Sequence, residues 1–206
     1  MAGKKAAAEQ TQEIKAKRMD VRLVEFNLEG DASVLVTHKW SEKAKKEMRD
    51  KQQKKVRGPR AAKDPEAECE AARYLDAEGR DCLPAIAFKK AIVDAASFSD
   101  DATKVILRGS VFVIGELVVI DYEKREMRED VVRVQMSSDL RYRPEYTGWK
   151  VKLPVQYDAS QLSIDQLVNF VARAGFSIGV GEHRPQKNGQ NGRFKIKSFH
   201  EVPAAG

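Results

Sequence analysis

The sequence predicts an α+β fold, in which a ferredoxin-like (βαββαβ) antiparallel sheet carries both of its helices on one face. Three observations support this prediction. Apolar and polar side chains alternate with a period of two near both ends of the chain, at residues 24–28 and 193–197. Two segments with helical apolar spacing, 83–98 and 164–174, lie between these ends. The residues that separate the two helices are rich in β-branched side chains, which favour strands.

Domain boundaries follow from changes in composition along the chain. Residues 1–18 are rich in Ala, Lys, Glu and Gln, so we expect a disordered or frayed helical arm. A single domain is expected over residues 19–202, and residues 203–206 form a tail. Residues 41–81 carry few large apolar side chains and contain Gly-Pro and Asp-Pro breaks. They are therefore predicted to form a charged, thumb-like insertion that projects from the core.

The first half of the core is predicted from apolar patterns. Residues 24–28 predict a half-buried strand, and residues 33–40 predict a second short strand or a continuation of the first. Residues 83–98 predict a core helix with Pro84 at its first position. The nearly continuous apolar run at 104–120 is broken only by a few residues that include glycines. It predicts strands that are buried on both faces or joined by a bulge.

Four further strands are predicted in the second half of the core. They are VVRVQM (131–136), RYRPEY (141–146), WKVKLPVQY (149–157) and RFKIKSF (193–199). The second of them contains a proline and is expected at a sheet edge. The sheet face away from the helices is expected to be basic, because it would carry Lys150, Lys152, Arg193, Lys195 and Lys197.

The helix before the last strand has clear start and stop signals. Ser163 and Gln166 have the spacing of a capping box, and Gly175 is expected to end the helix. A glycine-rich loop follows, GVGEHRPQKNGQNGRF at residues 179–194, which holds four of the chain's thirteen glycines. The loop is either a mobile hairpin tip or a segment whose exposed amides and cations contact phosphate. It lacks the GxxxxGK[ST] pattern of a nucleotide-triphosphate loop.

Charge is distributed unevenly along the chain. The 37 Lys and Arg exceed the 31 Asp and Glu, which gives a net charge of +6 and favours polyanionic partners. Residues 42–63 hold ten Lys and Arg against three acids, whereas residues 64–81 hold seven acids against two Arg. Opposite potentials steer association, so these blocks are expected to pair with each other or with a second copy in a homo-oligomer.

Several classes of protein are not indicated by the sequence. Cys69 and Cys82 have neither zinc-ligand spacing nor a disulfide framework, so we expect no metal and no cofactor. No apolar run approaches the ~20 residues of a membrane helix, and the first residues lack the apolar core of a signal peptide. A soluble cytoplasmic protein without a membrane partner is expected.

The loop and the order of elements resemble a known superfamily. A Gly-rich loop between the second helix and the last strand, and a basic insertion between the first strand and the first helix, are similar to the repeat-associated mysterious protein (RAMP) superfamily. Its members are RNA-binding subunits of CRISPR systems, and the insertion looks like the thumb of the backbone-forming subunits. The resemblance implies a ferredoxin-like fold and RNA binding.

A second resemblance rests on short stretches of sequence. They are THKWSEKAKKEM, LPAIAFKKAIVDAA, RGSVFVIGELV, EMREDVVRV, RYRPEYTGWKV and FSIGVGEHRPQKNGQNGRF. These stretches look like segments of a family of uncharacterised tailed-bacteriophage proteins. The resemblance implies a phage origin, and therefore a place in the cytoplasm of the infected host cell, but it implies no particular chemistry.

Candidate binding residues come from three basic segments. In RYRPEYTGWK the cations alternate with aromatic rings, a mixture suited to single strands because phosphates meet cations while bases stack on rings. Trp149 is either one of these stacking residues or an ordinary core residue, and the cations of the insertion either grip a backbone or form a solvated face. The candidate nucleic-acid-binding residues are Lys43, Lys46, Lys54, Lys55, Arg57, Arg60, Arg141, Tyr142, Arg143, Tyr146, Lys150, Lys152, His183, Arg184, Lys187, Arg193, Lys195 and Lys197.

These observations predict a protein that binds single-stranded RNA or DNA without chemistry and coats the strand cooperatively as an oligomer. One alternative is an interaction protein: an anti-defence factor that imitates a CRISPR backbone subunit and occupies a host defence complex, or a virion component. A lesser alternative is a metal-independent endoribonuclease with His38 or His183 as the general base.

Overall fold

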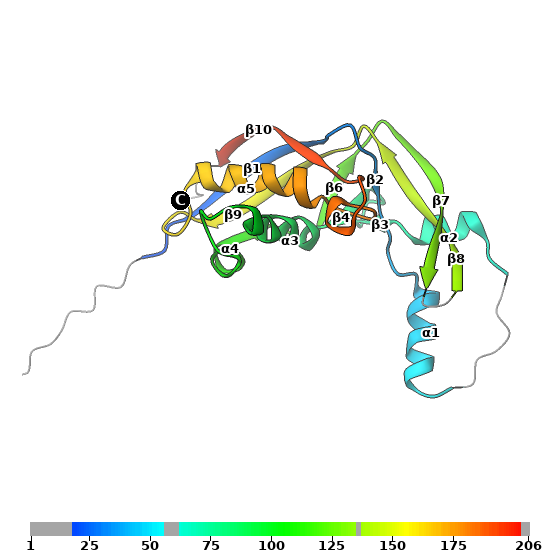
Figure 1. The fold of residues 1–206 in the computed structure, drawn as a ribbon. Helices are drawn as coiled ribbons and strands as arrows, with labels where there is room; N and C mark the ends of the chain where they lie inside the picture. Colours follow the sequence, from blue (N-terminus) through cyan, green and yellow to red (C-terminus); the bar gives the residue numbers. More distant parts are fainter. Residues whose placement is uncertain (1–17, 56–61, 135–136, 203–206) are drawn as a thin grey trace, which may run out of the picture.

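The computed structural model describes residues 18–55, 62–134 and 137–202. It consists of a main body, in which helices cover one face of an antiparallel sheet, and an arm that bends away from that sheet (Figure 1). Almost all of the predicted N-terminal arm, the tail at 203–206, and the candidate residues Arg57 and Arg60 lie outside the described residues.

The main sheet has the strand order β10-β1-β9-β6-β4-β3, and β5 pairs with β9 beside β6. Every pairing is antiparallel, which confirms the predicted α+β class with an antiparallel sheet. The strands are β1 (Val21–Gly30), β3 (Tyr74–Leu75), β4 (Asp81–Pro84), β5 (Val111–Val113), β6 (Leu117–Asp121), β9 (Lys150–Asp158) and β10 (Phe194–Val202).

The hydrophobic core lies between this sheet and its helices. The helices are α3 (Ala85–Ala95), α4 (Lys104–Ser110) and α5 (Ile164–Arg173), with a 3₁₀ turn at Ala96–Phe98 and a π turn at Ala174–Ile178. Alternate residues of β1 and β9 point into the core, where Phe26 and Leu153 pack with Phe88 of α3 and Phe170 of α5. The alternation predicted at residues 24–28 is therefore confirmed.

Two predicted element boundaries are wrong. Residues 104–110 were expected to be a strand but form α4, because Thr103 caps this segment by accepting a hydrogen bond from Ile106 N at 3.3 Å. Helix α5 begins at the predicted capping box, but the helical segment does not end at Gly175. It continues through the π turn to Gly179, whose φ of +70° ends it.

The arm consists of a long hairpin with a short third strand. Strands β7 (Lys124–Val134) and β8 (Ser137–Thr147) pair along their length, and β2 (Leu35–Val36) pairs with β8. Residues 131–136 and 141–146 were predicted as strands of the core sheet. Residues 131–134 and 141–146 are strands, but they belong to the arm and not to the main sheet, and residues 135–136 lie outside the described residues. Charged side chains occur on both faces of the hairpin, so neither face can be covered by the core helices.

The charged insertion packs beside the arm. Helix α2 (Pro65–Ala71) lies against the hairpin, where Glu70 forms an ion pair with Arg125 at 2.7 Å. Helix α1 (Glu42–Gln52) has no buried residue and extends on the side of the main sheet that carries α3 (Figure 1). The end of the segment returns to the main body as β3 and β4. Within the described residues, no helix is long and apolar enough to cross a membrane.

Candidate nucleic-acid interface

The glycine loop, residues 179–193, is fixed by its own backbone and by the segment around β2. Glu182 N donates to Val36 O at 2.8 Å, and Gly192 N donates to Val34 O at 2.8 Å. Gly192 has a φ of +65°, and a Cβ atom there would lie 1.7 Å from Val180 O. These glycines permit close backbone packing, so the loop is not a loose hairpin tip.

The tip of this loop contacts the arm. His183 Nε2 lies 3.3 Å from Nη1 of Arg143 and 3.4 Å from Oδ2 of Asp130. Asp130 also accepts hydrogen bonds from Arg143 and from Arg128 Nε, and Arg128 forms an ion pair with Glu145. We call these five residues, Arg128, Asp130, Arg143, Glu145 and His183, the junction cluster.

The junction cluster is a neutralised network rather than an open cationic site. Arg143 is only 6% exposed. Burial raises the pKa of Asp130, but the hydrogen bond from Arg128 and the nearby cations lower this pKa by more. Asp130 therefore stays ionised and holds both arginines. Arg143 was predicted to contact nucleic acid, but its burial makes it a residue that positions His183 and the loop tip.

His38 lies beside the junction cluster. Its Nδ1 is buried without a hydrogen-bond partner among the described residues. Burial and the positive charge of Arg143 lower the pKa of His38, so the ring is neutral at pH 7. The ring centroid of Trp40 lies 5.9 Å from that of His38, and Trp40 is 53% exposed. An exposed indole therefore stands between His38 and the start of α1.

Helix α1 supplies exposed cations next to this indole. Ser41 caps the helix by accepting a hydrogen bond from Ala44 N at 3.2 Å. Lys55 forms an ion pair with Asp50 at 3.3 Å. The other predicted cations here, Lys43, Lys46 and Lys54, have no acidic partner within ion-pair distance in the described part of the chain.

The two faces of the hairpin separate the residues predicted in RYRPEY. Arg141 and Arg143 share the face that meets His183, whereas Tyr142 lies on the opposite face across from Glu129. Arg141 is partly exposed and forms an ion pair with Asp139 at 3.2 Å. Because side chains alternate along a strand, cation and ring do not form one surface here.

Tyr146 and Trp149 are core residues, so neither is available to stack on a base. Tyr146 is fully buried and donates to Oδ1 of Asp81 at 2.7 Å, which corrects its prediction as a binding residue. Burial, together with the adjacent Asp81, raises the pKa of Tyr146 well above its ordinary value. Trp149 is fully buried and donates from Nε1 to Ser33 O at 3.0 Å, which settles its alternatives in favour of the core.

Three predicted cations lie on the open sheet face, away from the junction cluster. Lys150 pairs across strands with Glu29, and Lys195 forms an ion pair with the same Glu29 at 3.2 Å. Lys152 is opposite Asn27, and Glu25 of β1 points to the same face. This face is therefore of mixed charge, and the expectation of a basic sheet face is wrong.

The remaining predicted cations belong to the loop and the strand that follows it. Arg184 donates to Gly181 O at 2.9 Å, and Lys187 is exposed. Arg193 forms an ion pair with Asp31, and its guanidinium carbon lies 5.2 Å from the ring centroid of Phe176. Lys197 is exposed on β10. The predicted cations thus fall on more than one surface.

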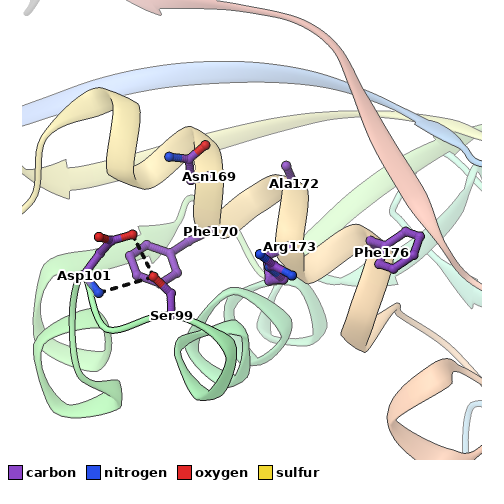
Figure 2. A pocket seen from close by; sticks show the side chains of 7 residues that line it. All are labelled: Ser99, Asp101, Asn169, Phe170, Ala172, Arg173 and Phe176. Atoms are coloured by element: carbon purple, nitrogen blue, oxygen red, sulfur yellow. Dashed lines mark hydrogen bonds between the residues drawn. The ribbon is translucent and has the colours of Figure 1, made fainter.

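The exposed aromatic residues that were not predicted as site residues include Trp40, Phe176 and Phe199. Trp40 directly precedes the cap of a basic helix, a signal that was present in the sequence. Phe176 follows Gly175, where the helix was expected to end, and Phe199 reads as part of a regular strand. Phe176 also lines a pocket of about 460 Å³ between α5 and the segment after α3, together with Arg173 and Asn169 (Figure 2).

The described residues contain no group of three or more His, Cys, Asp or Glu side chains that could hold a metal ion. Cys69 and Cys82 are both buried and free.

Comparisons with known proteins identify the fold. No protein-family model and no curated protein matches the sequence. A chain in the cryo-EM structure of the Type III-B Cmr-beta bound to cognate target RNA matches with 7% identity and a TM-score of 0.51, over 88% of this chain and 61% of that one. Cmr6 from Pyrococcus furiosus matches with 10% identity and a TM-score of 0.43, over 87% of this chain and 100% of Cmr6. The first match shows that the fold is similar to that of a chain in this complex.

Proposed function

We propose that this chain binds single-stranded nucleic acid, RNA or single-stranded DNA, without cleaving it. The observation that carries the proposal is the contact between His183 of the glycine loop and Arg143 of the arm, 3.3 Å apart. This contact holds His183, and with it the adjacent cation Arg184, beside the arm, from which the basic helix α1 extends (Figure 1).

Each part has a physical role in this proposal. Lys43 and Lys46 of α1, and Lys54 just beyond it, contact phosphates, because they are exposed and lack acidic partners in the described chain. Trp40 offers a ring for an unpaired base at the root of α1. The fixed backbone of the glycine loop lets Arg184 and Lys187 meet the strand without an ordering cost.

The fold is consistent with this proposal. We assign the main body to the ferredoxin-like type, because β1, α3, β6, β9, α5 and β10 follow one another in the order βαββαβ. The fold neighbour belongs to a complex that was determined bound to cognate target RNA. The phage-like stretches of the sequence favour a role in the cytoplasm of an infected cell, where the protein coats a strand as an oligomer.

Fluorescence anisotropy of a labelled 30-mer, measured from 50 to 300 mM salt, tests the proposal. Wild-type protein is expected to bind single strands with a steep salt dependence. In the variant K43Q/K46Q/K51Q/K54Q the slope of log affinity against log salt should fall by about 3, because each lost phosphate contact removes ~0.7.

The matched control is K150Q/K152Q, which changes two lysines on the open sheet face. It should leave the slope at the wild-type value. No binding by the wild type at 50 mM salt would refute the proposal, and a loss of slope confined to the control would move the surface to the sheet.

The alternative class is an interaction protein that imitates a CRISPR subunit in a host defence complex, or a virion component. The likeness in fold to a Cmr chain, combined with the phage-like stretches, favours it. Absence of binding to any oligonucleotide, with capture of a host CRISPR subunit by the purified protein, is the result that this alternative requires.

A ribonuclease is the lesser alternative, and the placement of two histidines beside Arg143 favours it. His183 contacts Arg143, and His38 is close enough for the charge of Arg143 to lower its pKa. A neutral imidazole can act as a general base. RNA that stays intact for hours with wild-type protein, or that is cut equally by H38A and H183A, would exclude this activity.

A further inference from the structure

A groove between α5 and β10 has no role in the surface described above. Its volume is about 790 Å³, and it runs beside β10, which pairs only with β1 and is the edge strand of the main sheet. Its lining includes Val168, Ala172, Phe176, Ile196, Lys197 and Phe199.

Two aromatic rings of the groove are exposed to solvent. Phe176 is 64% exposed and Phe199 is 43% exposed. Phe176 belongs to the π turn Ala174–Ile178, and it stands beyond the last turn of α5 (Figure 2). The π turn continues α5 past Gly175 and holds Phe176 at the end of the helix. Phe199 packs on the buried ring of Phe26, with 5.7 Å between the ring centroids, and the rest of its ring is open to solvent.

Cations surround these rings. The guanidinium of Arg193 lies over the ring of Phe176, with 5.2 Å from its carbon to the ring centroid. Lys197 of β10 lines the groove and is exposed. Asp31 is the acidic residue of the groove lining, and it is already paired with Arg193. Lys197 has no acid within ion-pair distance among the described residues.

This combination favours a ligand that is anionic and carries flat apolar groups. A single-stranded nucleic acid has both properties, whereas in a duplex the faces of the bases are stacked on one another. The groove is also continuous with the proposed surface, since Phe176 and Arg193 lie at the two ends of the glycine loop whose tip contacts the arm.

We propose that unpaired bases stack on Phe176 and Phe199 in this groove, while Lys197 contacts a phosphate beside them. The proposal rests on the proposed function, because it requires that the chain bind a single strand. The strand then runs along the foot of the glycine loop, and its bases rather than its phosphates occupy the apolar lining.

Substitution of the rings tests the groove. F176A and F199A should each weaken binding of a uridine or thymidine 15-mer by about 5- to 150-fold, the range for loss of one stacked base. The affinity of F176A and F199A for an abasic 15-mer, which keeps the phosphates, should equal that of the wild type for the same strand. K197Q should weaken binding to both ligands, and F176W should bind as the wild type does.

Phe112 provides a matched control. It is 45% exposed and has Lys89 Nζ 3.8 Å from its ring centroid, but it lies on β5, away from β10. F112A should bind both 15-mers like the wild type, and thermal unfolding should show that all variants are folded. If F176A and F199A bound the 15-mers as tightly as the wild type does, the proposed stacking in the groove would be overturned, but the proposed function would not. Absence of wild-type binding to either 15-mer would overturn the proposed function itself.

Discussion

Asp81 is a buried carboxylate at the point where the main sheet, the insertion and the arm meet. It is 3% exposed and accepts hydrogen bonds from Tyr146 at 2.7 Å, Tyr122 at 2.9 Å and Arg73 Nε at 2.8 Å. Burial alone would raise the pKa of Asp81, but these hydrogen bonds outweigh it and lower the pKa below its ordinary value. The charge of Asp81 therefore stabilises the fold.

The substitution Asp81→Asn should lower the free energy of unfolding by about 3 kcal/mol at pH 7, because it leaves Arg73 without its buried partner. The stabilisation is complete above the unfolded pKa of about 3.9 and is lost as the pH falls through the lowered folded pKa. The difference between wild type and variant should therefore shrink below pH 4. Urea unfolding at a series of pH values measures it.

The neighbouring Asp121 is exposed, so Asp121→Asn is the control and should change stability by less than about 0.5 kcal/mol. Equal stability of the two variants at pH 7 would show that the Asp81 network contributes nothing.

At this scale the sequence identifies inward residues such as Phe26 well, because their neighbours alternate. It does not identify Tyr146 as buried, because its partner Asp81 is 65 residues away.

Among the elements, the glycine loop is held most closely by its own backbone. Gly192→Ala would place a Cβ atom 1.7 Å from Val180 O at a positive φ. The hydrogen bonds of Gly192 N to Val34 O and of Val180 N to Gly192 O would then be lost or distorted. We expect the free energy of unfolding to fall by about 2–4 kcal/mol, as measured in urea.

Gly109→Ala is the matched control for this prediction. Gly109 lies in α4 without a positive φ, and a Cβ atom added there would meet nothing within 4 Å. Alanine there should raise stability by about 0.5–1 kcal/mol, since it is the better helix former. If Gly192→Ala proved as stable as the wild type, the loop would not be fixed by the contacts described.

A helix could be predicted from the sequence where its signals lie within a few neighbouring residues. The capping box of Ser163 and Gln166 lies within four residues and predicts the start of α5 correctly. Helix α4 was missed because Val105 and Ile106 are β-branched, and only the cap at Thr103 and the burial of Leu107 in the core favour a helix. Tertiary packing decides such short segments.

On the scale of the whole molecule, the sequence predicts the antiparallel main body but not the arm. The pattern of β7 and β8 is that of ordinary strands, and nothing in it states that they leave the sheet. The split of the predicted cations has the same origin. Lys150 and His183 were predicted to belong to one surface, yet Lys150 lies on the open sheet face and His183 lies in the glycine loop, in contact with the arm.

Cooperative coating of a strand is a prediction at this scale. If copies assemble side by side, binding to a 60-mer should be sigmoidal with a Hill coefficient above 1, whereas binding to a 12-mer should be hyperbolic. Sedimentation velocity should show complexes of several copies on the 60-mer. The acids of residues 64–81 leave limited charge for such contacts, since Glu70, Asp76 and Asp81 already have arginine partners within the chain.

Hyperbolic binding to both lengths, with one copy sedimenting on the short strand and independent copies on the long one, would contradict cooperative coating. The 12-mer is the control, because it leaves little room for a second copy. This outcome would leave the binding surface itself untouched.

The hairpin of the arm grows directly out of two neighbouring strands, β6 and β9, which pair with each other at its base. At ~3.4 Å per residue, its 11-residue strands reach about 35 Å from that base. Deleting two residues from each strand in register would shorten this reach by about 7 Å and keep every remaining side chain on its present face. The length of the hairpin can therefore be changed by two residues per strand at a time, without any change to the main sheet that carries it.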